Sequence, residues 1–152
     1  MEKSLDEDSV NEECVSAGRV MPASDPAKQS ALALAYIGDS ALDLYVKTFF
    51  VKTSDKQTYK YHRDVSAIVK AVNQAAFAEE ILEELNEGEL SVYKRGRNAN
   101  THSKAKNATR GEYMKATGLE ALFGYLYLKD DKDRFAYFAD RMIEEYLSGK
   151  DK

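Results

Sequence analysis

The chain has 152 residues, of which 43% are hydrophobic and 32% are charged, and its formal net charge is −4. This size and apolar content fit one folded domain and exclude a wholly disordered chain. The single cysteine, Cys14, excludes an internal disulfide framework and a cysteine-based zinc site, and the sequence has neither a long uncharged apolar run nor a start that resembles a signal peptide.

The charge is unevenly distributed along the chain. Residues 1–26 hold seven acidic and two basic side chains, include Pro22 and Pro26, and lack apolar periodicity. We predict a flexible acidic tail over 1–26 and a folded domain over 27–150. Residues 94–115 hold seven basic side chains against Glu112 alone. Because exposed charges more than about 10 Å apart are largely screened from each other, such blocks matter more than the total. A net-acidic chain can therefore still bind nucleic acid.

From residue 28 onward the apolar spacing is helical nearly everywhere, which predicts an all-α fold with about six helices. The predicted segments are residues 29–51, 56–63, 64–85, 90–100, 112–129 and 134–147, with a loop at 101–111. The predicted buried stripe of the third segment is Val65, Ile68, Val69, Val72, Ala76, Ile81 and Leu85. Gly38 lies inside the first segment. Since a helical glycine costs about 1 kcal/mol against alanine, either the helix breaks there or another element approaches closely.

Two acidic residues lie in predicted core helices. Asp39 follows Gly38 at the margin of an apolar face, and Glu120 lies at the edge of the apolar arc of the fifth segment. Buried carboxylates are usually paired, hydrogen-bonded or bound to a metal, so these two could meet across a helix–helix contact and bind Mg²⁺ or Mn²⁺. The alternatives are structural: Asp39 as a helix N-cap, and Glu120 paired with a nearby Lys, Arg or Tyr.

A basic segment covers the C-terminal end of the fourth predicted helix and the adjoining loop, where its cations are interspersed with amide and hydroxyl side chains. These residue types contact phosphates and sugars in nucleic acids. A solvated basic face that complements the helix dipole is the alternative. The candidate RNA contacts are Lys94, Arg95, Arg97, Asn98, Lys104, Lys106 and Arg110, together with His62, which could instead be an ordinary surface residue.

Three collinear motifs resemble a known family. The run Leu34–Leu42 (LAYIGDSAL) resembles the first signature of the ribonuclease III catalytic domain. The run Thr117–Leu128 (TGLEALFGYLYL) resembles its second signature, in which Glu-Ala-Leu-x-Gly precedes an apolar helix end. The segment Lys94–Ala99 (KRGRNA) and the AYIGD form of the first motif are similar to the Mini-ribonuclease III subgroup. The resemblance covers residues 28–147.

The resemblance implies a Mg²⁺-dependent endoribonuclease, with Mn²⁺ as a possible substitute, that cleaves double-stranded RNA to 5′-phosphate products as a homodimer. For the subgroup it further implies maturation of the large-subunit ribosomal RNA precursor in the cytoplasm. Asp39 and Glu120 match the family's catalytic, metal-binding carboxylates. Two further family carboxylates are replaced here by Ala35 and Thr117. No segment remains after Lys152 for a separate RNA-binding domain, so we expect the catalytic domain to bind RNA by itself.

Two other functions stay open at this point. A non-catalytic double-stranded-RNA-binding or ribosome-assembly module would bind RNA in a salt-sensitive way without cleaving it. An all-α protein-interaction domain would have no RNA affinity. If the protein dimerises, an apolar patch that includes Tyr36, Ile37 and Leu44 is the candidate interface.

Overall fold

The computed structural model describes residues 25–99 and 107–150, and within these ranges the chain is helical with no strand, which confirms the predicted all-α class. Most of the predicted tail, with Cys14, lies outside the described residues. None of the described helices is long and apolar enough to cross a membrane. The elements are the 3₁₀ helices η1 (Pro26–Lys28) and η2 (Leu82–Glu84) and the α-helices α3 (Ala31–Thr53), α4 (Thr58–Val69), α5 (Ala71–Ile81), α6 (Glu87–Arg97), α7 (Arg110–Leu128) and α8 (Lys132–Lys150).

Side-chain caps set the starts of three helices. The Ser30 hydroxyl accepts a hydrogen bond from the Ala33 amide and caps α3. The helices α6 and α7 each begin with a capping box, in which the cap residue and the third helical residue bond to each other's backbone amides. The pairs are Asn86 with Glu89 in α6 and Thr109 with Glu112 in α7. These polar residues precede the apolar stripes, so α6 and α7 begin two or three residues earlier than the apolar spacing predicts.

The prediction of one helix from residue 64 to 85 is wrong. Asp64 lies inside α4, where it is buried and accepts hydrogen bonds from Lys56 at 3.1 Å and Tyr146 at 2.7 Å. The helix then ends at Val69, because the backbone of Lys70 is extended. The break changes the phase of the inward face, so Val72 is 39% exposed whereas Gln74 is buried.

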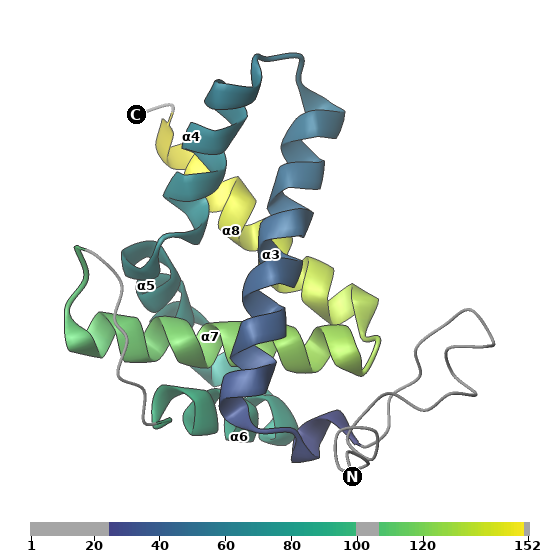
Figure 1. The fold of residues 1–152 in the computed structure, drawn as a ribbon, viewed down its shortest axis with the longest axis vertical. Coiled ribbons are helices and arrows are strands. Elements are labelled where there is room, and N and C mark those ends of the chain that lie inside the picture. The colour runs from purple at the N-terminus through teal and green to yellow at the C-terminus, as the bar shows by residue number, and fades with distance from the viewer. Residues whose placement is uncertain (1–24, 100–106, 151–152) are drawn as a thin grey trace, which may run out of the picture.

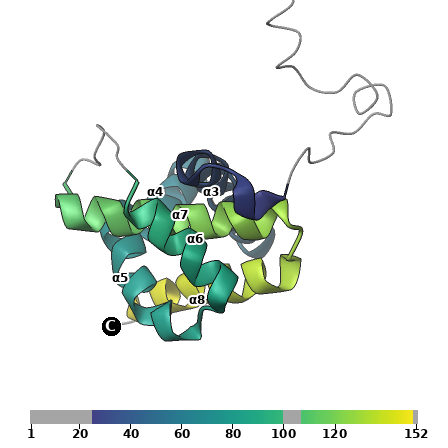
Figure 2. The same ribbon diagram turned by 90° about the horizontal axis from the view of Figure 1, so that it is seen from below.

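The helix α7 is the centre of the domain. It runs across the middle of the molecule, with α3 crossing in front of it and α6 below it (Figure 1). Viewed from below, α3 and α8 lie on opposite sides of α7 (Figure 2). Ten residues of α7 are buried, from Ala116 to Leu126 with Glu120 as the partly exposed exception. This environment explains the nearly continuous apolar sequence of the helix.

Two close backbone contacts fix the helices that cross α7. At the α3 crossing, a Cβ on Gly38 would overlap the Glu120 carbonyl, and a Cβ on Gly124 would overlap the Leu34 carbonyl. At the α6 crossing, a Cβ on Gly96 would lie 2.9 Å from the Gly118 Cα. Of the two explanations that the sequence allowed for Gly38, close approach of another element is therefore correct, and α3 continues through it unbroken.

Candidate active site

The α3–α7 crossing brings together the two acidic residues that the sequence analysis selected. Asp39 follows Gly38 on α3, and its side chain is exposed; Glu120 is partly buried on α7, and the two carboxyl groups are within hydrogen-bonding contact. Asp39 is not an N-cap, because it lies well inside α3, which Ser30 caps. The described partners of Glu120 are Asp39 and Gln74, in place of the Lys, Arg or Tyr of the structural alternative.

The environment of Glu120 favours its protonated form when no cation is present. The pKa of its carboxyl group is raised from 4.5 to about 8, chiefly by burial and then by the nearby Asp39 carboxylate, while the hydrogen bond from Gln74 opposes the shift. Two like-charged oxygens held together at a partly dry site are unfavourable until a proton or a cation lies between them.

The sequence analysis missed Gln74. This residue lies on α5, is 2% exposed, and donates from Nε2 to the Glu120 carboxylate at 3.4 Å and to the Val69 carbonyl at 2.7 Å. Its Oε1 atom is buried and has no hydrogen-bond partner. The predicted continuous helix placed the neighbouring Val72 inward instead. A helix break at Lys70 shifts the helical phase so that Gln74 faces inward, and the predicted helix did not include this break.

The donor atoms at this site fit Mg²⁺ or Mn²⁺. The site offers two carboxylates at one helix crossing, and hard divalent cations prefer oxygen ligands. Within the described ranges, no cluster of three or more His, Cys, Asp or Glu side chains is suited to a metal. Mg²⁺ commonly uses one or two carboxylates and completes its shell with water and substrate phosphate.

The two positions at which the resemblance implies further carboxylates hold none here. Ala35 has no ligand atom and is buried one turn before Asp39. The buried Thr117 hydroxyl donates to the Tyr113 carbonyl of its own helix at 3.0 Å. Protein ligands from these positions are therefore absent, and Asp39 and Glu120 are the two carboxylates that the crossing provides.

The basic end of α6 lies beside the carboxylate pair. A Cβ on Gly96 would lie 3.1 Å from the Thr117 carbonyl and 2.8 Å from the Ala121 Cβ, so this end of α6 packs on the turn of α7 that carries Glu120. The motif KRGRNA has its glycine where the two backbones meet. Its cations flank this contact in the sequence.

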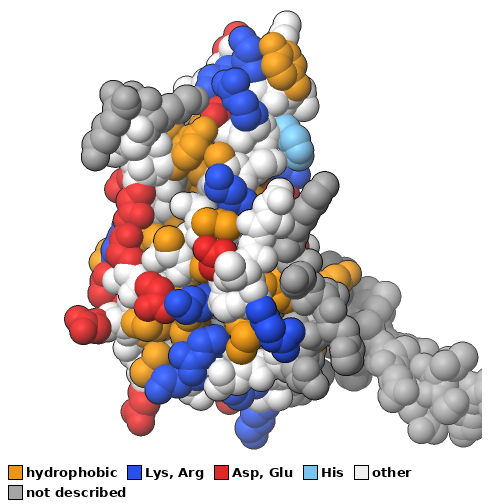
Figure 3. All heavy atoms as spheres, turned by 90° about the vertical axis from the view of Figure 1, so that its left-hand side faces the viewer, with side chains coloured by type: hydrophobic (Ala, Val, Ile, Leu, Met, Phe, Trp, Pro, Cys, Tyr) orange, Lys and Arg blue, Asp and Glu red, His pale blue; other side chains and the backbone are white. Residues whose placement is uncertain are grey.

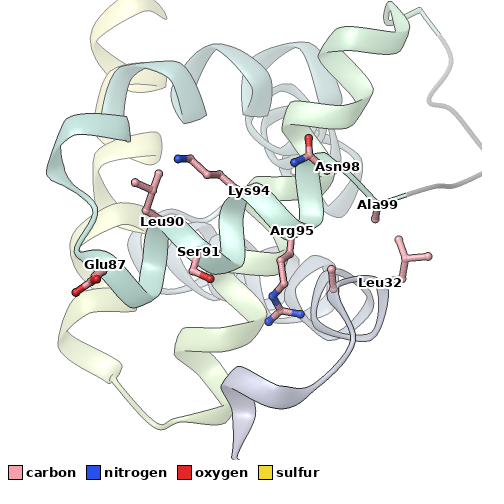
Figure 4. Close-up of a pocket in the computed structure, with 9 residues that line it drawn as sticks. Leu32, Glu87, Leu90, Ser91, Lys94, Arg95, Asn98 and Ala99 are labelled. Carbon is pink, nitrogen blue, oxygen red and sulfur yellow. The ribbon is translucent and has the colours of Figure 1, made fainter.

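The predicted RNA contacts of α6 differ in what they do. Lys94 and Asn98 are exposed and line a groove of about 750 Å³ between α6 and the start of α3 (Figure 4). Arg95 is also exposed, but its guanidinium donates to the Ala27 and Gln29 carbonyls at 2.9 and 3.0 Å and so holds η1 against α6. The Arg97 guanidinium lies 5.8 Å from the centre of the Tyr93 ring.

The groove and the carboxylate pair share one side of α3. Leu32, which lines the groove opposite Lys94 and Asn98, lies seven residues before Asp39. Seven residues are almost two turns, so both side chains project from the same face, about 10 Å apart along the axis. This spacing is comparable to that of a few phosphates along one nucleic-acid strand.

The remaining predicted contacts are dispersed. Arg110 is exposed at the start of α7, His62 is exposed on α4 at the other end of the domain from α6, and Lys104 and Lys106 lie outside the described residues. Figure 3 shows Lys and Arg side chains in the lower part of one face and again at its top, with acidic side chains along one edge. The described residues do not bring His62 together with the α6 cations.

Comparison with known proteins identifies this architecture. The profile described as "Ribonuclease III domain" matches residues 32–131. The chain belongs to the ribonuclease III family. A Mini-ribonuclease 3 from Clostridium tetani is 38% identical over 123 residues, which are 80% of this chain and 82% of the relative. A Mini-ribonuclease 3 from Enterococcus faecalis is 41% identical over 107 residues, or 69% and 81% of the two chains.

The fold agrees with a solved structure as well. A crystal structure of a protein from Fusobacterium nucleatum superposes with a TM-score of 0.75 and 26% identity, covering 84% of this chain and 98% of that one. This ribonuclease III domain is therefore an RNase III-type endoribonuclease, and the predicted family and enzyme class are confirmed. The family acts on double-stranded RNA and is generally dependent on a divalent metal.

The shifted pKa of Glu120 predicts how stability depends on pH. Because the pKa is about 8 in the folded protein and ordinarily 4.5, the folded state binds the extra proton between these values. The contribution of this proton to the free energy of unfolding is complete below pH 4.5 and is lost as the pH rises through 8. We expect Glu120→Gln to flatten this decline by roughly 1–3 kcal/mol, measured by urea unfolding in EDTA at several pH values.

A second carboxyl group provides the internal reference for this measurement. Burial and a hydrogen bond with Glu80 raise the pKa of Glu145 to about 7. This group therefore also makes stability fall as the pH rises, and Glu120→Gln leaves its contribution unchanged. Parallel stability–pH curves for the wild type and Glu120→Gln would contradict the assignment of the shift to Glu120.

Proposed function

We propose that this domain cleaves double-stranded RNA in a Mg²⁺-dependent reaction at the Asp39–Glu120 pair, with Mn²⁺ as a substitute, and leaves 5′-phosphate ends. The observation that supports this most is the meeting of two carboxylates, one of them partly buried, at the Gly38–Gly124 crossing. Unpaired like charges are costly to hold together, so their retention in a tightly packed crossing favours a cation-dependent role over a purely structural one.

Asp39 and Glu120 would together hold the cation, and Gln74 would hold Glu120 from behind. When bound, Mg²⁺ supplies stabilisation of charge on the scissile phosphate and lowers the pKa of a water. The partly dry surroundings of Glu120 strengthen the carboxylate's attraction for a cation, because the effective dielectric constant is lower there than in bulk water. The exposed Asp39 leaves the site open to a phosphate from the outer side of α3.

We propose that the RNA duplex lies along α6 and the start of α3. Lys94 and Asn98 line the groove there, Arg97 lies on the same end of α6, and Arg110, Lys104 and Lys106 extend the basic sequence beyond α6. Arg95 is a weaker candidate because both ends of its guanidinium are bonded to backbone carbonyls. His62 would reach only a duplex long enough to extend to α4.

The family relationship supports a finer proposal for the substrate. Relatives named Mini-ribonuclease 3 match most of the chain, and the KRGRNA and AYIGD motifs are similar to that subgroup. We therefore propose the precursor of the large-subunit ribosomal RNA, in the cytoplasm, as the substrate.

We also propose a homodimer, since a two-fold protein can present two identical sites to the two strands of a duplex. Tyr36 and Leu44, which are 80% and 66% exposed on α3, are unusual as solvent-facing apolar side chains. Leu44 also lines an apolar groove of about 520 Å³ with Tyr127 of α7. Ile37, the third residue of the predicted patch, is partly buried next to Gly124 and contributes less to this surface.

The cleavage test uses long double-stranded RNA and purified protein. We expect cleavage in Mg²⁺ or Mn²⁺, none in EDTA, and a loss of at least ~100-fold in rate for Glu120→Gln and for Asp39→Asn, because each removes a cation ligand. Asp43→Asn is the matched control, since Asp43 lies one turn after Asp39 on α3 and is paired with Lys47 at 2.7 Å. Cleavage that persists in Glu120→Gln, or that is unchanged in EDTA, would contradict the assignment of the cation site to Asp39 and Glu120.

The same samples separate the other two functions. Salt-sensitive binding of the duplex without products at any Mg²⁺ or Mn²⁺ concentration would favour the non-catalytic RNA-binding module. No affinity for the duplex would favour the protein-interaction domain.

The RNA-binding face is tested by measuring affinity at several salt concentrations in EDTA, where the duplex stays intact. We expect Lys94→Ala with Arg97→Ala to weaken binding at least ~10-fold and to reduce the slope of log K against log salt by about 2, one for each lost phosphate contact. Lys132→Ala, an exposed cation at the start of α8, is the control. An unchanged salt slope in the double variant would move the RNA to another face.

Sedimentation measures the oligomeric state. We expect a dimer at micromolar concentration and a monomer for Leu44→Arg, which puts a charge into the apolar groove without touching the buried core. Tyr59→Arg is the control, because Tyr59 is a 65% exposed apolar side chain on α4 and does not line the groove. A wild-type monomer at this concentration would rule out the dimer proposal.

A further inference from the structure

The amide of Gln74 links the end of α4 to the carboxylate site. Its Nε2 donates to two acceptors, the Val69 carbonyl at 2.7 Å and the Glu120 carboxylate at 3.4 Å. Since the Val69 carbonyl can only accept, the reverse orientation would place Oε1 against another acceptor, so the orientation of the amide is fixed by this carbonyl. The oxygen end is left buried and without a partner.

Asn73 shows how much of this arrangement the fold alone requires. Its Nδ2 donates to the Ile68 carbonyl at 2.7 Å, so two successive amides satisfy the last carbonyls of α4 across the break at Lys70. This local role explains one hydrogen bond of Gln74. It explains neither the contact with Glu120 nor the unpaired Oε1, and burying an unsatisfied acceptor is destabilising.

We propose that Gln74 is a positioning residue for the divalent cation site. Nε2 fixes the orientation of the Glu120 carboxylate from the α5 side, and Oε1 accepts a hydrogen bond from water when the site is loaded. An amide that turns its N–H groups toward Glu120 is suited to orient a ligand rather than to bind the cation itself. The 3.4 Å separation fits this role, because such contacts are often long in unloaded sites.

This inference rests on the proposed function, because it needs Asp39 and Glu120 to hold a cation. Mutation of a residue that orients a metal ligand typically lowers metal affinity or activity by 10- to 100-fold. The expected defect of a Gln74 variant is therefore in cation affinity. RNA binding depends on the α6 face and should be unaffected.

The test measures Mn²⁺ binding to the full chain without RNA, by electron paramagnetic resonance of the free ion. We expect Gln74→Met, which keeps the volume and removes both hydrogen-bonding ends, to weaken Mn²⁺ binding ~10- to 100-fold. Asn73→Leu is the matched control, since it loses the same kind of bond to α4 without touching Glu120. Its Mn²⁺ affinity should stay within about 2-fold of the wild type.

Cleavage kinetics give a second readout that a purely structural role would not move. Gln74→Met should raise the Mg²⁺ concentration for half-maximal cleavage, leave the KM for RNA unchanged, and recover activity in excess Mg²⁺. Should Gln74→Met fail to fold, Gln74→Asn keeps a buried amide but is one methylene too short to reach Glu120, and the same weaker Mn²⁺ binding is expected.

Two results would overturn the inference, and they are distinguishable. Wild-type Mn²⁺ affinity in Gln74→Met, with weakened binding in Glu120→Gln, refutes the role of Gln74 and leaves the proposed function intact. Absence of Mn²⁺ binding to the wild type, or binding that Glu120→Gln does not change, removes the cation site itself and the inference with it.

Discussion

The absence of a side chain at four glycines allows the site to exist. Gly38 and Gly124 let the backbones of α3 and α7 meet, and Gly96 and Gly118 do the same for α6 and α7. Glu120 lies between the two crossings on α7. One crossing supplies its carboxylate partner, and the other brings the basic end of α6 beside it. Larger residues would separate these helices, and the two halves of the site would move apart together with them.

The same packing makes the site costly to the folded chain. The surrounding core holds Glu120 in a setting that raises its pKa, next to a second carboxylate. Burial of α7 and polar contacts elsewhere offset this unfavourable free energy. One such contact is the Glu89–Arg134 ion pair, at 2.8 Å, between α6 and α8. In the proposed function, stability and activity would therefore oppose each other at Glu120, as is common where ionisable groups are held together for chemistry.

Much of this organisation could be predicted from residue pattern alone. The helical period gave the all-α class, and acidic residues in apolar helices selected Asp39 and Glu120. The break at Lys70 could not be predicted, because neither proline nor glycine marks it and the apolar spacing runs on through it. That break hid Gln74. The engagement of Arg95 with the Ala27 and Gln29 carbonyls was also hidden, since it depends on how η1 folds back onto α6.

The unequal exposure of the three polar residues gives the site a direction. Gln74 closes it on the α5 side, Glu120 lies at intermediate depth, and Asp39 is at the surface. Asp39 therefore marks the side from which solvent reaches the pair. A bulky group attached beside Asp39, for instance at the exposed Ser40, would therefore obstruct the approach to the pair while leaving Glu120 and Gln74 in place.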